Sequence, residues 1–160
     1  MNNSMSKEWE YILHANRDVI LEQWLERSLA LFPEKMGYDT PVAEVLADAL
    51  SKLLCGLGEE NQRFRDALDD VTRILAVQSF PPSRAISIFF EPKTMFREMM
   101  MKPALAERLT LEVQSAFSSR IDELVLQAFD SYTQHREKIA QLKVEEGSRR
   151  MYMALRRAEA

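Results

Sequence analysis

The hydrophobic positions of this chain recur at spacings of three, four and seven residues, which is the period of one face of an α-helix. The first such segment covers residues 7–32, where Leu13, Ile20 and Trp24 share a face and Pro33 follows the end. Glycine (4 of 160 residues) and β-branched residues are scarce, so there is little material for a sheet. The pattern predicts an all-α fold, a single bundle of about five helices; a globin-like arrangement without haem is an analogy at the level of the fold.

Two further helices are predicted before the middle of the chain. Thr40 and Pro41 suit the cap and the first position of one helix, and Gly56 suits its end. The next helix is expected to begin near Glu59 and to reach Gln78, whose amide can donate and accept hydrogen bonds at the corner that follows.

Prolines interrupt the centre of the chain. Residues 79–83 must separate two helices, because neither Pro81 nor Pro82 fits a helix interior, and Pro82 is expected to open a fourth helix. Pro92 falls inside that helix and predicts either a kink or a break. The methionines and aromatic residues of this region indicate either a deformable ligand or partner surface or simply core. The residues of this candidate surface are Gln78, Phe80, Phe89, Phe90, Met95, Phe96 and Met99.

The last predicted helix covers residues 104–143. At ~1.5 Å per residue it would span roughly 60 Å, longer than a bundle of this size, so its second half is expected to project. Its apolar positions fall into heptads, which favours a homodimer or an output helix; packing along its own bundle is the alternative. Polar groups in such a seam would weaken the pairing, as a switchable coiled coil requires. The heptad positions are Ile121, Val125, Ala128, Tyr132, His135, Ile139 and Leu142.

Charge is unevenly distributed along the chain. The net charge is −4, which argues against a nucleic-acid partner held by a broad basic surface. Gly147 and Ser148 are expected to interrupt the helix, and residues 144–160 are interpreted as a separate basic tail, either solvated or docked on an acidic partner. Its arginines are Arg149, Arg150, Arg156 and Arg157.

Residues with catalytic or cofactor chemistry are few. Four scattered glycines cannot form a phosphate-binding loop, and one cysteine, Cys55, excludes an intramolecular disulfide and a thiolate zinc cluster. Cys55 lies in an apolar run and is expected to be buried. The only histidines, His14 and His135, lie outside the segments that would supply an axial haem ligand, which leaves a haem sensor as the weakest alternative. No catalytic residue, metal site or cofactor is predicted.

The chain also lacks the pattern of a membrane segment. No window approaches the ~18 apolar residues that span a bilayer, and the first ten residues are polar. We therefore expect no membrane insertion and a cytoplasmic location.

One stretch is more specific than these patterns. Residues 73–85 resemble the signature RAVQ-x-F-x-P-S-x-A of the RsbRD N-terminal domain family. Pro81 and Pro92 depart from it, because members usually have Thr or Ser at the first position and leucines around the second. The resemblance covers residues 10–102. Its other pieces are Trp24 with Leu-Phe-Pro at 31–33, Asp-Thr-Pro-Val at 39–42 and Leu-Leu-Cys-Gly at 53–56.

The resemblance implies a helical signal-input domain, here residues 1–143 with the long helix included. In the regulator that names the family, this domain precedes an output domain that restrains a stress-signalling kinase in a cytoplasmic assembly. Stand-alone relatives are found in anaerobic sulfur-reducing bacteria, near genes for a membrane redox complex of sulfite reduction. The first hypothesis is thus a non-enzymatic regulatory domain in the stress response that binds a regulatory kinase or antagonist. The second is an accessory subunit of such a redox complex.

Overall fold

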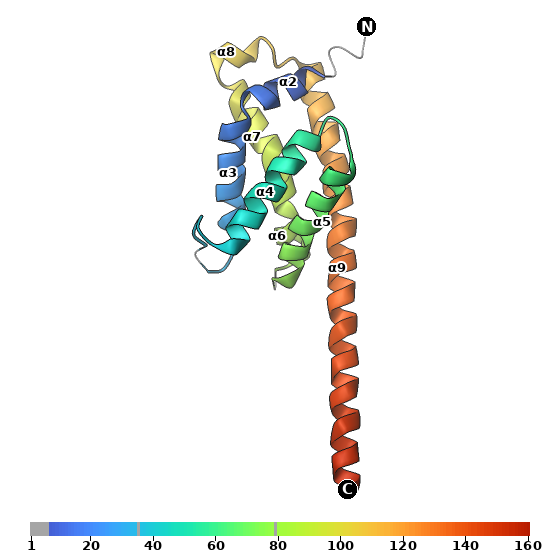
Figure 1. The fold of residues 1–160 in the computed structure, drawn as a ribbon. Coiled ribbons are helices and arrows are strands. Elements are labelled where there is room, and N and C mark those ends of the chain that lie inside the picture. Colours follow the sequence, from blue (N-terminus) through green and yellow to red (C-terminus); the bar gives the residue numbers. More distant parts are fainter. Residues whose placement is uncertain (1–6, 35, 79) are drawn as a thin grey trace.

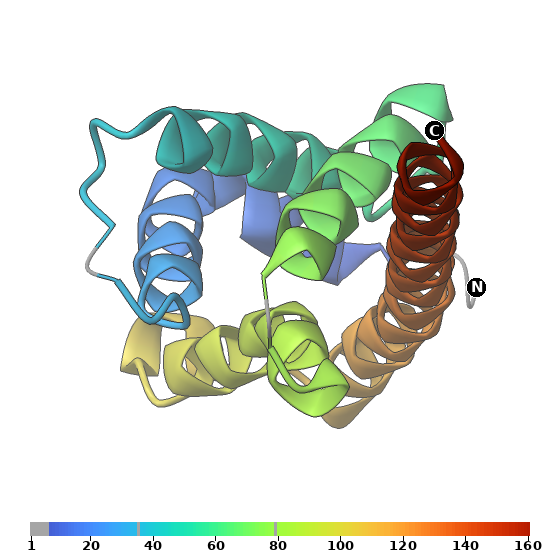
Figure 2. The ribbon, with the colours of Figure 1, turned by 90° about the horizontal axis from the view of Figure 1, so that it is seen from below.

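The computed structural model describes residues 7–34, 36–78 and 80–160, and every regular element in these ranges is helical. Helices α3, α4, α5, α7 and α9 surround the core, and α9 continues far beyond the bundle (Figure 1, Figure 2). This confirms the predicted all-α fold with a long C-terminal helix. The elements are α2 (Glu8–Ala15), α3 (Arg17–Leu29), α4 (Pro41–Gly56), α5 (Gln62–Val77), α6 (Pro82–Ser87), the 3₁₀ turn η1 (Ile88–Phe90), α7 (Glu91–Met100), α8 (Pro103–Ala106) and α9 (Leu111–Glu159).

The first predicted helix is in fact two helices, divided at Asn16. The backbone of Asn16 leaves the helical region, and its side-chain amide donates to the carbonyl of Ile12 at 2.8 Å. Asparagine competes in this way with the main-chain hydrogen bonds of a helix. Because of the break, Trp9 in α2 and Trp24 in α3 reach separate parts of the core.

Helices α4 and α5 form a tight antiparallel pair (Figure 1). The predicted cap of α4 is confirmed: Thr40 Oγ1 accepts a hydrogen bond from the amide of Ala43. The next helix begins at Gln62, three residues later than predicted, because the side chain of Asn61 accepts from the amide of Phe64. A Cβ atom on Gly56 would lie 2.7 Å from the Phe64 ring, so only glycine permits this approach.

Two glycine substitutions are expected to have opposite effects on stability. Gly56→Ala should lower the free energy of unfolding by about 1–3 kcal/mol, because the added methyl overlaps Phe64. Gly147→Ala should raise the free energy of unfolding by between zero and about 1 kcal/mol. No atom lies within 4 Å of the added Cβ, and alanine favours the helix. Urea unfolding of the two variants checks this contrast, and equal effects would contradict it.

Pro92 interrupts the fourth predicted helix, as expected. The chain passes from α6 through the turn η1 into α7, where Pro92 occupies the first turn. A proline lacks the N–H that would bond the carbonyl four residues earlier, here that of Ile88. The amide of Glu91 donates to this carbonyl across the 3₁₀ turn, and Trp24 Nε1 donates to it at 2.9 Å, so the buried indole takes the place of the second donor and ties α3 to η1.

The long helix begins later and ends later than predicted. Pro103 opens only the short α8, whereas Thr110 caps α9 by accepting a hydrogen bond from the amide of Val113. The expected interruption at Gly147 was wrong: α9 passes through it to Glu159. One exposed glycine costs a helix about 1 kcal/mol, which good helix formers on both sides can offset.

Candidate functional site

The predicted heptad seam of α9 is largely covered by the protein's own bundle. Ile121, Ala128 and Tyr132 are buried, and Val125 and Ile139 pack partly against the core. Helix α5 lies along this side of α9 (Figure 2). Of the two alternatives for this seam, the structure therefore shows packing along the bundle as far as Ile139. Beyond that point Leu142 is exposed.

Polar contacts line the same junction between α5 and α9. His135 Nε2 lies 2.7 Å from Asp69 Oδ1, and the hydroxyls of Thr72 and Ser131 are 2.6 Å apart. Arg136 donates to the carbonyl of Ala76, near the C-terminal end of α5. The polar seam positions thus bind α9 to its own domain, just before the helix leaves it.

The residues around Asp69 lower the pKa of its carboxyl group. Partial burial disfavours its charged form, but hydrogen bonds from Arg73 and His135 outweigh burial, and the pKa of Asp69 lies below its usual value of 3.8. A carboxyl group whose pKa is lower in the folded than in the unfolded protein stabilises the fold at pH values above its unfolded-state pKa. That stabilisation is lost as the pH falls through the lower, folded-state pKa.

Asp69→Asn is therefore expected to have a small, pH-dependent effect. The side chain is 47% exposed, so the loss at neutral pH should stay below about 1 kcal/mol. Urea midpoints of the wild type and the variant should differ from pH 7 down to about pH 5 and converge only as the pH falls below 3.8, through the folded-state pKa of Asp69. A difference that stayed the same as the pH fell from about 5 to about 2 would contradict this account of the Asp69 contacts.

The candidate surface around Pro92 belongs mainly to the core. Phe80 fills the corner before α6 and packs edge-on against Phe32, with 5.6 Å between ring centroids. Gln78 is half-buried, and its side chain makes no hydrogen bond with residues that the structure describes. Of the remaining positions, the only one exposed is Phe90. The buried positions are Phe89, Met95, Phe96 and Met99.

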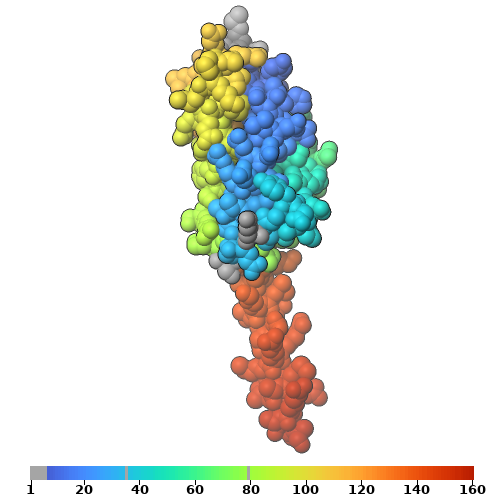
Figure 3. Space-filling model, turned by 90° about the vertical axis from the view of Figure 1, so that its left-hand side faces the viewer, coloured from blue at the N-terminus to red at the C-terminus, as the bar shows by residue number. Residues whose placement is uncertain are grey.

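Residues 140–160 of α9 project from the bundle, and every one of them is exposed (Figure 3). At ~1.5 Å per residue this part is about 30 Å long. Val144, Met151 and Leu155 lie on one side of it, which we call the C-terminal face. This face is turned roughly 140° around the helix from Ile139, so it does not continue the side that packs on the bundle.

The four arginines predicted as a basic tail lie within this projecting helix. All four lie well away from the C-terminal face, Arg149 and Arg156 on one flank of the helix and Arg150 and Arg157 on the other. Arg150 forms an ion pair with Glu146 one turn earlier. The arginines thus belong to an ordered helical surface rather than to a separate segment.

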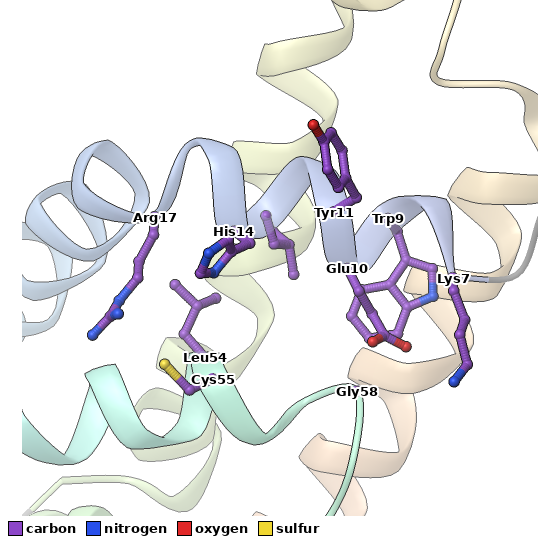
Figure 4. Close-up of a pocket in the computed structure, with 10 residues that line it drawn as sticks. Lys7, Trp9, Glu10, Tyr11, His14, Arg17, Leu54, Cys55 and Gly58 are labelled. Carbon is purple, nitrogen blue, oxygen red and sulfur yellow. The ribbon is translucent and has the colours of Figure 1, made fainter.

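A pocket of about 420 Å³ lies between α2 and the C-terminal end of α4 (Figure 4). Trp9, Leu13 and Leu54 supply its apolar wall, and Arg17 bonds to Ser51 beside it. The pocket was not predicted, because it forms only where α2 turns across α4. Its other lining residues are Lys7, Glu10, Tyr11, His14, Cys55 and Gly58.

Cys55 lies at this pocket and is exposed, so the prediction that it is buried was wrong. Leu53 and Leu54 face the core, and the next residue is turned about 100° away from Leu54. His14 points toward Leu54 and Cys55 (Figure 4).

Two absences can be stated for the part of the chain that the structure describes. Within residues 7–34, 36–78 and 80–160, no group of three His, Cys, Asp or Glu side chains could hold a metal ion. In the same ranges, no helix combines the length and the hydropathy that a membrane span requires.

Comparison with known proteins places this helical domain in a family. A protein of Archaeoglobus fulgidus, described as an uncharacterized protein, is 28% identical to the chain over 139 residues, which cover 82% of this chain and 84% of that protein. No solved structure is significantly similar to the chain. The family model of the RsbT co-antagonist protein rsbRD N-terminal domain matches residues 18–146, which extends beyond the C-terminal end of the sequence resemblance. The chain therefore belongs to the rsbRD N-terminal domain family, a family of regulatory sensor domains of the stressosome type.

Proposed function

We propose that this protein is a non-enzymatic regulatory domain of the stress response that acts by binding another protein through the projecting part of α9. The observation that carries the proposal is the exposure of residues 140–160 on a helix whose earlier part is firmly packed. Val144, Met151 and Leu155 are all more than half exposed on one side of it. Apolar residues on one face of a helix favour docking against a partner.

The pocket beside α2 is the candidate input site of this domain. Its wall residue Trp9 also packs against Phe117 of α9, with 5.6 Å between ring centroids. Phe96 of α7 also stacks against Phe117, with 4.2 Å between ring centroids. A molecule in the pocket would thus contact a side chain that touches the output helix directly. The proposed location of the whole assembly is the cytoplasm.

Affinity capture from a native-host lysate tests the proposal, with two variants that each introduce two aspartates into the same part of α9. Val144→Asp/Met151→Asp changes the C-terminal face, where both residues are about two-thirds exposed. Leu142→Asp/Met153→Asp changes the opposite side, where the residues are 55% and 56% exposed. We expect the first variant to capture at least about tenfold less partner than the wild type, and the second variant to capture as much as the wild type.

The identity of the captured protein separates the two functional hypotheses. A kinase or a phosphorylation-dependent regulator supports the stress-signalling role. Subunits of a sulfite-reduction complex support the accessory role instead. Equal capture by both double variants would contradict a role for the C-terminal face in either.

A further inference from the structure

We propose that the partner bound by the C-terminal face is an amphipathic helix with acidic residues along its flank, in a two-stranded coiled coil. The proposal rests on the proposed function and adds the chemistry of the partner. Three features of residues 140–160 carry it: the spacing of the apolar residues, the charge beside them and the size of the residues between them.

The apolar spacing is that of a coiled-coil seam. Val144 and Met151 are seven residues apart and occupy equivalent positions of successive heptads. The positions that alternate with them are Ala140, Gly147 and Ala154. All five are exposed on one side of a continuous helix, so an incoming helix meets no obstacle from the bundle.

A row of cations runs along one flank of this seam. Lys143, Arg150 and Arg157 follow each other at intervals of seven residues and are all exposed. In heptad terms they take the g position, which faces the flank of the partner helix in either orientation. Lys143 and Arg157 are best complemented by carboxylates at the facing positions of that partner, whereas Arg150 already forms an ion pair with Glu146.

A second copy of this chain does not offer that complement. In a parallel pair Lys143 would face Ser148 and Arg150 would face Leu155 of the other copy, neither of which is acidic. In an antiparallel pair the cations would face each other, which is repulsive. Charge therefore gives a parallel homodimer through this segment no attraction and opposes an antiparallel one.

The sizes of the seam residues point the same way. Ala140, Gly147 and Ala154 leave space along the seam, and two copies would place these small residues opposite each other with little apolar area buried. A partner with leucines at its seam positions would fill that space. Size and charge thus both favour a different helix over a second copy.

The test uses the full chain and two designed peptides of four heptads as probes. Both peptides have Leu at the a and d positions; one has Glu at e and g, the other Lys. We expect the Glu peptide to bind at least about tenfold more tightly by fluorescence anisotropy, with a smaller difference at high salt. The net charge of the whole chain is −4, so non-specific attraction would favour the Lys peptide instead.

Charge reversal provides the matched control. Lys143→Glu/Arg157→Glu should invert the preference between the peptides. Arg149→Glu/Arg156→Glu makes the same change in net charge on the far side of the helix and should leave the preference unchanged. An identical response of both variants would overturn the assignment of the flank.

Three other outcomes would overturn the inference. The first is binding of neither peptide while Val144→Asp/Met151→Asp still abolishes capture, which leaves the proposed function standing. The second is concentration-dependent self-association in sedimentation that the same substitutions abolish, which assigns the face to a second copy. The third is binding to phosphatidylglycerol vesicles without peptide binding, which assigns it to a membrane surface. Failure of the capture experiment instead contradicts the proposed function itself.

Discussion

Tyr132→Ala is expected to lower the free energy of unfolding by about 3–5 kcal/mol, the cost typical of removing a large buried ring. Tyr132 is 2% exposed and lies on α9 a short way before the helix leaves the bundle. Its hydroxyl lies 3.5 Å from the carbonyl of Phe80, at the corner between α5 and α6. Urea unfolding measures the loss, which should come with faster hydrogen exchange in residues 128–139.

Tyr132→Phe is the matched control for this prediction. It keeps the ring and removes only a long hydrogen bond, so the loss should stay below about 1 kcal/mol. If Tyr132→Ala were as mild as Tyr132→Phe, the ring would not hold α9 on the bundle. The helix would then have to be fixed by its earlier contacts alone.

Trp24→Phe is expected to lower the free energy of unfolding by about 2–4 kcal/mol. The indole is fully buried, and the smaller ring leaves unfilled volume. The substitution also removes one donor to the carbonyl of Ile88, which an ordinary helix would have bonded to the amide of residue 92. Thermal or urea unfolding of the variant measures the sum of these two losses.

A double-mutant cycle isolates the hydrogen bond from the loss of packing. Pro92→Ala supplies the missing N–H, so its effect should be more favourable by about 1 kcal/mol or more in the Trp24→Phe background than in the wild type. In the wild type the same change loses the packing of the buried Pro92 ring and gains no comparable hydrogen bond, because Trp24 already bonds the Ile88 carbonyl. Additive effects of the two substitutions would show that Trp24 does not substitute for the amide lost at Pro92.

Local chemistry made much of the fold predictable. The cap at Thr40, the position of Pro41 and the interruption at Pro92 depend on one or two residues each, and all three predictions are confirmed. The break at Asn16 was missed because the apolar period continues through it. Periodicity reports which side of a segment is apolar, but it does not detect a short break that leaves the period intact.

The use of α9 could not be predicted in the same way. A heptad pattern shows that a face will be covered, but not whether the cover comes from another chain or from the same one. Here α5 brings Asp69 and Thr72 opposite His135 and Ser131, contacts between residues about sixty positions apart. The projecting face did have a signal in the sequence, since Val144 and Met151 share the seven-residue spacing of the cations beside them.

The most direct test of the central claim is hydrogen exchange of the full chain, measured alone and bound to the captured partner. The account predicts that residues 111–139 are protected in both states, because this part of α9 packs on the bundle. It predicts that residues 140–160 exchange quickly in the free protein and become protected only in the complex. Protection of another surface by the partner, with residues 140–160 unchanged, would contradict the claim that the projecting part of α9 binds it.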